Sequence, residues 1–233
     1  MFVFRKFKYL SRDFSIFAAT DCRMRCAVIF LSMIRNIVFD LGGVVIGRDY
    51  EAAGQQLHEF AFLRGDQPFP EFWKNYDLGL VGRKEVVSAL AAGNNISLAQ
   101  ADDKLQLLIE MFNVFPDTEH LIRDLHRHDF RLYVLSNMPF DFYEHVKSFD
   151  VFRLFDGLLI SSCEKLAKPD PRFFKLLCSR FGFEPESALF VDDKPSNTGV
   201  ARQLGFHTCT FVPSAEGCRV LKNILIDDGT YCE

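Results

Sequence analysis

The fold of this chain is decided by one short stretch, Ile37-Val38-Phe39-Asp40-Leu41-Gly42-Gly43-Val44-Val45. An apolar, strand-favouring run ends abruptly in one carboxylate, and two glycines follow soon after. Open parallel α/β sheets bind their ligands at the carboxyl ends of the strands, so Asp40 stands where a nucleophile or a metal ligand belongs. The glycines let backbone groups approach a phosphate or a metal closely. A tight turn in which Asp40 caps the next helix is the alternative interpretation.

Three later segments end in the residue types that a phosphoryl-transfer site still needs. They are Ser136-Asn137 after an apolar run, Lys168 just before a predicted helix that begins at Pro171, and Asp192-Asp193 after the apolar run 188–191. A hydroxyl and an amide can donate hydrogen bonds to anionic oxygens, and a lysine supplies a compact positive charge. Carboxylate oxygens are the ligands that magnesium prefers. The alternative interpretations are a turn for Ser136-Asn137, a solvated surface charge for Lys168 and a helix cap for Asp192-Asp193. Together and in this order, the three segments indicate a phosphate site.

The four segments resemble the ordered motifs of the haloacid dehalogenase-like (HAD) hydrolase superfamily, over roughly residues 34–212. The subgroup that looks most similar is the small sugar-phosphate phosphatases, including α-D-glucose-1-phosphate phosphatases. These also carry an Asp-Leu-Gly, a Leu-Ser-Asn and a Lys-Pro motif. The resemblance implies an α/β fold with a doubly wound parallel sheet of Rossmann type and an inserted small helical cap. It also implies a magnesium-dependent phosphatase.

The resemblance implies a role for each matched residue. Asp40 would attack phosphorus and form an aspartyl-phosphate, which splits one hard displacement into two easier ones. Ser136 and Lys168 would bind the oxygens of the transferred group, where negative charge sits in the transition state. Asn137 and Gly43 would be further contacts to the substrate. The implied magnesium ligands are Asp40, the backbone carbonyl of Gly42, Asp192 and, directly or through water, Asp193.

Gly42 departs from the superfamily pattern, because many of its phosphatases have a second aspartate there that protonates the leaving group. General acid–base help is commonly worth about a hundred- to ten-thousand-fold in rate. Three explanations are open: a weakly catalytic phosphometabolite-binding or interaction protein, an acid recruited from the cap with Asp49 as a candidate, or a leaving group that needs little protonation. We favour the third, which predicts that sugar 1-phosphates are turned over better than sugar 6-phosphates.

Metal-independent haloacid dehalogenases belong to the same superfamily and also lack the second aspartate. The adjacent carboxylates of Asp192 and Asp193 favour a phosphatase instead, because two neighbouring acids repel each other unless a cation binds them. Chelation of metal should therefore abolish the activity.

The chain divides into three predicted parts. Residues 1–32 read as an N-terminal extension of doubtful role, with Met33 as an alternative start. Residues 33–48 and 116–233 form the α/β core, and residues 49–115 form the helical cap. The cap aromatics invite a sugar-stacking role, but their clustering on one short helix favours packing in the cap core. They are Phe69, Phe72, Trp73 and Tyr76.

Periodicity and turn residues predict the individual elements. The expected helices are 50–63, 70–78, 83–92, 98–111, 117–126, 140–149, 171–181 and 196–204. The expected strands after the first are 131–135, 157–160, 188–191 and 207–211. This alternation is that of a doubly wound sheet.

Composition agrees with a compact enzyme acting on small molecules. The 233 residues carry a net charge of −4, so no broad positive field attracts nucleic acid or anionic membranes. Seven scattered cysteines cannot all pair with one another, and reduced thiols in the cytoplasm are the simplest interpretation. The expected partner is a small phosphorylated metabolite, with no nucleic acid and no membrane; the sequence leaves the oligomeric state undetermined.

Overall fold

The computed structural model of this protein describes residues 34–50, 54–64 and 68–227. The predictions for residues 1–32 and for Met33 as the start lie outside the described residues, as do three of the seven cysteines, Cys22, Cys26 and Cys232. Among the helices that are described, none combines the length and the apolar character needed to cross a bilayer.

Five parallel strands form the central sheet, in the order β5-β4-β1-β6-β7. Their bounds are β1 Asn36–Phe39, β4 Arg131–Ser136, β5 Gly157–Ile160, β6 Ala188–Asp192 and β7 His207–Thr210. β1 lies in the middle, with Phe39 in register with Val134 of β4 and Val191 of β6. Since all the strands run the same way, their carboxyl ends meet at one edge of the sheet, and Asp40 follows directly at its centre.

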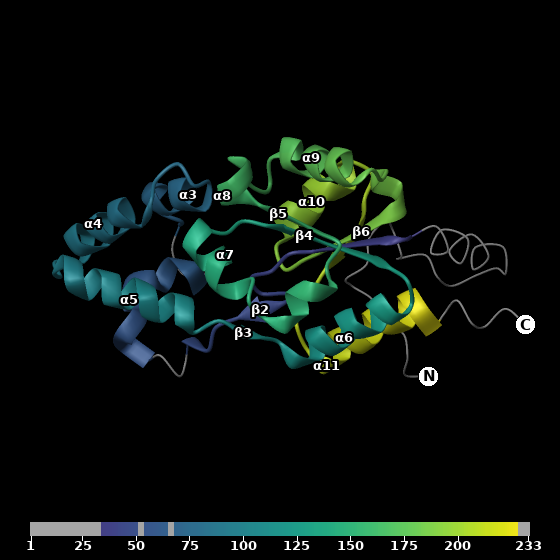
Figure 1. Ribbon diagram of the computed structural model, residues 1–233, viewed down its shortest axis with the longest axis horizontal. Helices are drawn as coiled ribbons and strands as arrows, with labels where there is room; N and C mark the ends of the chain where they lie inside the picture. Colours follow the sequence, from purple (N-terminus) through teal and green to yellow (C-terminus); the bar gives the residue numbers. More distant parts are fainter. Residues whose placement is uncertain (1–33, 51–53, 65–67, 228–233) are drawn as a thin grey trace, which may run out of the picture.

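Helices cover both faces of this sheet, which confirms the predicted α/β fold (Figure 1). Helices α9 (Pro171–Phe181) and α10 (Pro195–Gln203) lie on one face, and α6 (Pro116–Arg127) and α11 (Ala215–Lys222) on the other. The short elements α7 Phe140–Val146, α8 Ser161–Glu164, η3 Asp150–Leu154, η4 Pro185–Ser187 and η5 Asn223–Asp227 complete the core.

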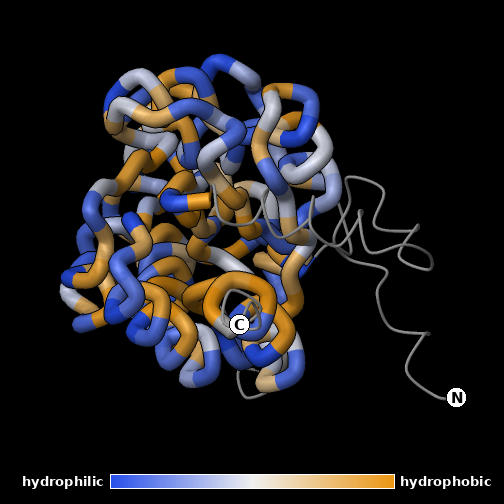
Figure 2. The backbone as a smooth tube through the Cα atoms, turned by 90° about the vertical axis from the view of Figure 1, so that its right-hand side faces the viewer, coloured by the Kyte–Doolittle hydropathy of each residue, from blue (hydrophilic) through white to orange (hydrophobic). Residues whose placement is uncertain are grey.

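Alternation along β1 divides the core into two apolar clusters. Val38 packs into the cluster that includes Phe173 and Phe174 of α9, whereas Ile37 and Phe39 belong to the cluster of the opposite face. A strand buried on both faces is expected to be apolar throughout, which is why the run before Asp40 contains no polar alternation. Figure 2 shows hydrophobic stretches concentrated in the middle of the molecule and hydrophilic ones distributed over its outside.

The cap lies beside the sheet as a separate group of helices, α3 (Glu71–Asp77), α4 (Arg83–Asn94) and α5 (Leu98–Glu110), with the 3-10 segment η2 (Gly54–Arg64) (Figure 1). The chain leaves and re-enters the core through a short antiparallel ribbon of β2 (Ile46–Gly47) and β3 (Asn113–Val114).

Cap aromatics pack against one another. Trp73 is 2% exposed, and its ring makes edge-on contacts with Phe60, Phe62 and Phe142. Tyr76 is equally buried, and its hydroxyl donates to Asp141. The interpretation as buried core therefore holds for Trp73 and Tyr76, whereas Phe69 and Phe72 are half-buried against the same cluster, and Lys194 Nζ lies 5.5 Å from the centroid of the Phe69 ring.

Three local features differ from the sequence predictions. The described part of the helix expected over 50–63 is a 3-10 helix, Gly54–Arg64, with non-helical backbone at Leu57 and Phe60; Phe60 and Phe62 both pack against the Trp73 ring. β3 falls inside the range predicted to be purely helical, since its pairing with β2 is a long-range contact. The helix α11 was missed, because an eight-residue helix depends on packing rather than on its own propensity.

Candidate functional site

The Asp40 carboxylate is oriented by three donors that converge on Oδ1. The backbone N–H of Leu41 donates to it over 2.6 Å, and the Ser136 hydroxyl over 2.9 Å. The Lys168 Nζ lies 2.9 Å from the same oxygen. Asp40 follows β1, Ser136 ends β4, and Lys168 precedes α9, so three distant segments meet because their strand ends and helix start share one edge. A carboxylate held in this way has little freedom to rotate, which suits a nucleophile.

Lys168 bridges the first and last motifs. Its Nζ lies 2.7 Å from Asp192 Oδ2 and 2.9 Å from Asp40 Oδ1, and its side chain is 1% exposed. Burial alone would lower the pKa of Lys168, but the charges of Asp40 and Asp192 together raise it above its ordinary value. The ammonium therefore stays protonated and presents a fixed positive charge at the strand ends.

Asn137 holds the Lys168 backbone. Its Nδ2 donates to the Lys168 carbonyl and its Oδ1 accepts from the Lys168 N–H, both over 2.8 Å. The Asn137 side-chain amide is thus engaged in positioning the lysine, while the expected substrate contact was through either the backbone amide or the side chain. Its role as a substrate contact stays a prediction, and the structure adds a positioning role that the sequence did not show.

The Asp192 carboxylate is also held by groups that the sequence did not point out. Asn197, in the first turn of α10, lies with its Nδ2 3.0 Å from both carboxylate oxygens, and the Lys194 N–H donates to Oδ1 over 2.8 Å. Groups that orient a metal-binding carboxylate from behind commonly matter for metal affinity. The sequence signal that could have identified Asn197 is its position as a polar residue in the first turn of the helix that follows Asp192 and Asp193.

Gly43 allows the tight turn that follows the nucleophile Asp40. Its φ is +79°, and a Cβ at this position would lie 2.8 Å from Asp193 Oδ2, so a side chain here would meet that carboxylate. Its N–H donates to the Ile46 carbonyl over 2.9 Å. The Gly43 N–H is therefore already used within the turn. The expected contact between Gly43 and the substrate stays a prediction. Gly42 is exposed in the same turn, and a Cβ there would meet no atom within 4 Å.

The residues at this edge fit a divalent cation. Asp40, Asp192 and Asp193 each offer a carboxylate oxygen, and these atoms lie within 4.8 Å of one another. Asp193 Oδ1 is buried and has no hydrogen-bond partner among the described residues. A buried polar atom without a partner is uncommon and calls for a ligand. The donor set is all oxygen, which matches magnesium.

Electrostatics at the edge favour the same conclusion. Burial raises the pKa of Asp40; Lys168 opposes this, and the charge of Asp192 adds to it. Burial, followed by the charge of Asp40, raises the pKa of Asp193 to about 6. Lys168 and Lys194 lower the pKa values of Asp40 and Asp193 without offsetting the rise, so three acids still repel one another here, and a bound cation would relieve that repulsion.

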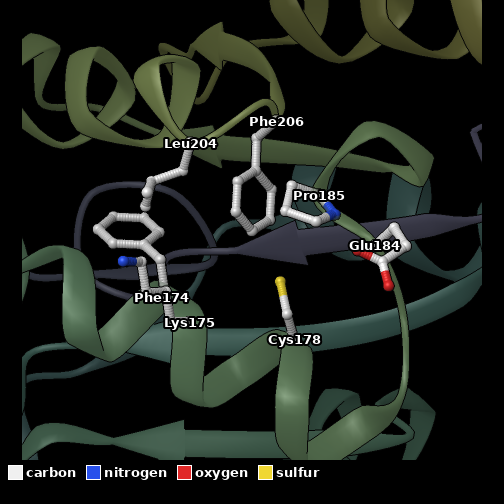
Figure 3. Close-up of a pocket in the computed structure, with 7 residues that line it drawn as sticks. All are labelled: Phe174, Lys175, Cys178, Glu184, Pro185, Leu204 and Phe206. Carbon is white, nitrogen blue, oxygen red and sulfur yellow. The ribbon is translucent and has the colours of Figure 1, made fainter.

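A cavity of about 240 Å³ lies away from these residues, beside α9 (Figure 3). It is lined by Phe174, Lys175, Cys178, Glu184, Pro185, Leu204 and Phe206. Burial raises the pKa of the Cys178 thiol to about 12, so the group is protonated and unreactive at neutral pH. None of these lining residues takes part in the candidate site.

The family model described as haloacid dehalogenase-like hydrolase matches residues 34–205, which include all four motifs. The chain belongs to this family. The crystal structure of a wild-type HAD family enzyme from Bacteroides thetaiotaomicron, in complex with magnesium and inorganic phosphate, superposes with a TM-score of 0.61 and 26% identity. The match covers 78% of this chain and 96% of that chain. The predicted family is thus confirmed.

Relatives of this HAD-like hydrolase include proteins named for different reactions. The D-ribitol-5-phosphate phosphatase of Bacteroides thetaiotaomicron is 28% identical over 76% of this chain and 91% of its own length. The (S)-2-haloacid dehalogenase of Pseudomonas putida is 27% identical over 76% of this chain and 83% of its own length. Drimenol cyclase of Aspergillus calidoustus is 27% identical over 82% of this chain, but the chain spans only 37% of that protein.

Proposed function

We propose that this HAD-like hydrolase is a magnesium-dependent phosphatase that hydrolyses a small phosphorylated metabolite, with sugar phosphates as the substrate class. The observation that carries the proposal is the acidic triad Asp40, Asp192 and Asp193, with the unpartnered Asp193 oxygen beside the oriented nucleophile. A phosphatase relative and a structural neighbour bound to magnesium and phosphate support it.

Each residue of the site has a task in this reaction. Asp40 attacks phosphorus, the bond to the leaving oxygen breaks, and an aspartyl-phosphate forms; water then hydrolyses it. Ser136 and Lys168 bind the phosphoryl oxygens, so catalysis consists largely of positioning and electrostatic stabilisation. Asp40, the Gly42 carbonyl, Asp192 and Asp193 would hold Mg²⁺, which when bound neutralises the repulsion between the nucleophile and the substrate.

We place the reaction in the cytoplasm. Among the described residues, Cys163, Cys178, Cys209 and Cys218 are free thiols. Unpaired cysteines in this number suit a reducing compartment.

The decisive test is phosphate release from sugar 1-phosphates, sugar 6-phosphates and p-nitrophenyl phosphate, with magnesium or with a chelator. We expect release that needs magnesium and that disappears in Asp40→Asn. The matched control is Asp103→Asn, which makes the same chemical change at an exposed position of the cap. This control should keep the activity of the wild type.

Two other outcomes would replace the proposal. Release of halide from a 2-haloacid in the presence of chelator would make the protein a dehalogenase, as some relatives are. Tight binding of a sugar phosphate without any release would make it a binding protein, in agreement with the missing acid at Gly42.

A further inference from the structure

The end of cap helix α3 is joined by hydrogen bonds to the loop that follows the Ser136-Asn137 motif. The Ser161 hydroxyl, at the start of α8, donates to the Asp77 carbonyl and accepts from the Met138 N–H over 2.9 Å. Met138 follows the Ser136-Asn137 motif, so one hydroxyl joins the last residue of α3 to the loop that carries this motif. The cap residue Asp77 therefore has a defined place relative to the phosphate site.

The turn after Asp77 fixes the same contact from a second side. Gly79 has a φ of +61°, and a Cβ there would lie 2.5 Å from the Ser162 carbonyl oxygen. The Lys165 ammonium donates to the carbonyls of Gly79 and Ser162. The backbone that follows Asp77 is therefore held against α8.

The Asp77 carboxyl group is half-buried and forms no hydrogen bond or ion pair with any described residue. Three charged groups act on it: Lys194 from the loop after β6, Arg48 from the segment after β2, and the nucleophile Asp40. Arg48 is committed elsewhere, since its Nε donates to the Leu108 carbonyl over 2.7 Å and its guanidinium lies 3.4 Å from the centroid of the Phe112 ring.

These surroundings bring the pKa of Asp77 close to neutral pH. Burial raises its pKa to about 7; Lys194 and Arg48 oppose the shift, and the charge of Asp40 adds to it. A carboxyl group that titrates near the working pH can both give and take a proton. Asp49, the cap acid considered from the sequence, is exposed instead.

We propose that Asp77 is the general acid and base of this enzyme, acting from the cap in place of the carboxylate that Gly42 lacks; this replaces the explanation favoured from the sequence, a leaving group that needs little protonation, with an acid recruited from the cap. The proposal rests on the proposed phosphatase function. In the first step the Asp77 carboxyl group gives its proton to the leaving oxygen as the P–O bond breaks and the bond from Asp40 to phosphorus forms. In the second step the Asp77 carboxylate takes a proton from the attacking water as the bond between phosphorus and Asp40 breaks, which releases phosphate.

Two substrates of nearly the same shape separate this role from a merely structural one. p-Nitrophenyl phosphate has an acidic leaving group that needs no proton, whereas phenyl phosphate has a much less acidic one. With enzyme in excess over substrate, release of the phenol reports the first step alone. For Asp77→Asn we expect a loss of about a hundred-fold or more on phenyl phosphate and little change on p-nitrophenyl phosphate.

Equal losses on both substrates, or no loss on either, would overturn the proposal. Asp77→Ser is assayed alongside, so that the result does not depend on how one replacement packs, and Asp103→Asn is again the control in the cap. A wild type without magnesium-dependent release from either phosphate would refute the proposed function itself. If the wild type is active but the Asp77 variants lose the same factor on both substrates, the role of Asp77 is refuted and the proposed phosphatase function stands.

Discussion

The side-chain amide of Asn197 lies 3.0 Å from both carboxylate oxygens of Asp192. Asp192 is completely buried at the end of β6, and this contact, the Lys194 N–H and the Lys168 ammonium together fix the orientation of its carboxylate. A carboxylate oriented before the metal arrives loses less freedom when the metal binds.

Asn197→Ala should therefore weaken magnesium binding by about 10- to 100-fold, the usual effect of removing a group that orients a metal ligand. Titration calorimetry with magnesium would measure this. Asn36→Ala is the matched control, because Asn36 is equally buried and bonded to Ser187 at the far end of the sheet. An equal loss of affinity in both variants would show that the effect is general destabilisation.

Lys168→Met should destabilise the metal-free protein by about 3–5 kcal/mol, the usual cost of removing one partner from a buried ion pair. The substitution leaves the buried carboxylates of Asp40 and Asp192 facing each other without the ammonium between them. Urea unfolding without magnesium would measure the loss. Lys175→Met, at an exposed position, should change the stability by less than about 0.5 kcal/mol.

The stability of the metal-free protein should depend on Asp77 between about pH 4 and pH 7. Folding raises the pKa of this carboxyl group from 3.8 to about 7, so the folded state holds a proton in this range that the unfolded state has released. Stability must then fall as the pH rises through the window. Asp77→Asn should gain stability over the wild type at about pH 7.5 and gain much less near pH 4. A difference that is independent of pH would contradict the raised pKa.

Gly42→Asp should increase turnover of phenyl phosphate by about ten-fold or more, because it adds an acid two residues after the nucleophile. The position can accept a side chain, since a Cβ there meets no atom within 4 Å. The gain should be largest in the Asp77→Asn background, where no other acid is available. Steady-state assays of the single and double variants would measure it, with Gly42→Asn as the control that fills the same space. Equal gains from the two substitutions would show that protonation does not limit the rate.

Local sequence was sufficient to predict the strands of the sheet and the polar residues at their carboxyl ends. Apolar runs that end in Asp40, Ser136 and Asp192 predict buried strands followed by polar groups. A parallel sheet must bring such strand ends together, whatever the rest of the chain does. The register of β1 with β4 and β6 places all three residues at one edge, as expected.

The sequence by itself therefore determined the fold class and the set of charged and polar groups at the strand ends. Only the tertiary structure decided which groups act on them: Asn137 on the Lys168 backbone, Asn197 on Asp192, and Asp77 from the cap. The physical reason is that a strand end is specified by neighbouring residues. A contact between the cap and the core instead depends on how two separately packed groups of helices and strands meet. A local sequence pattern cannot predict the geometry of that contact.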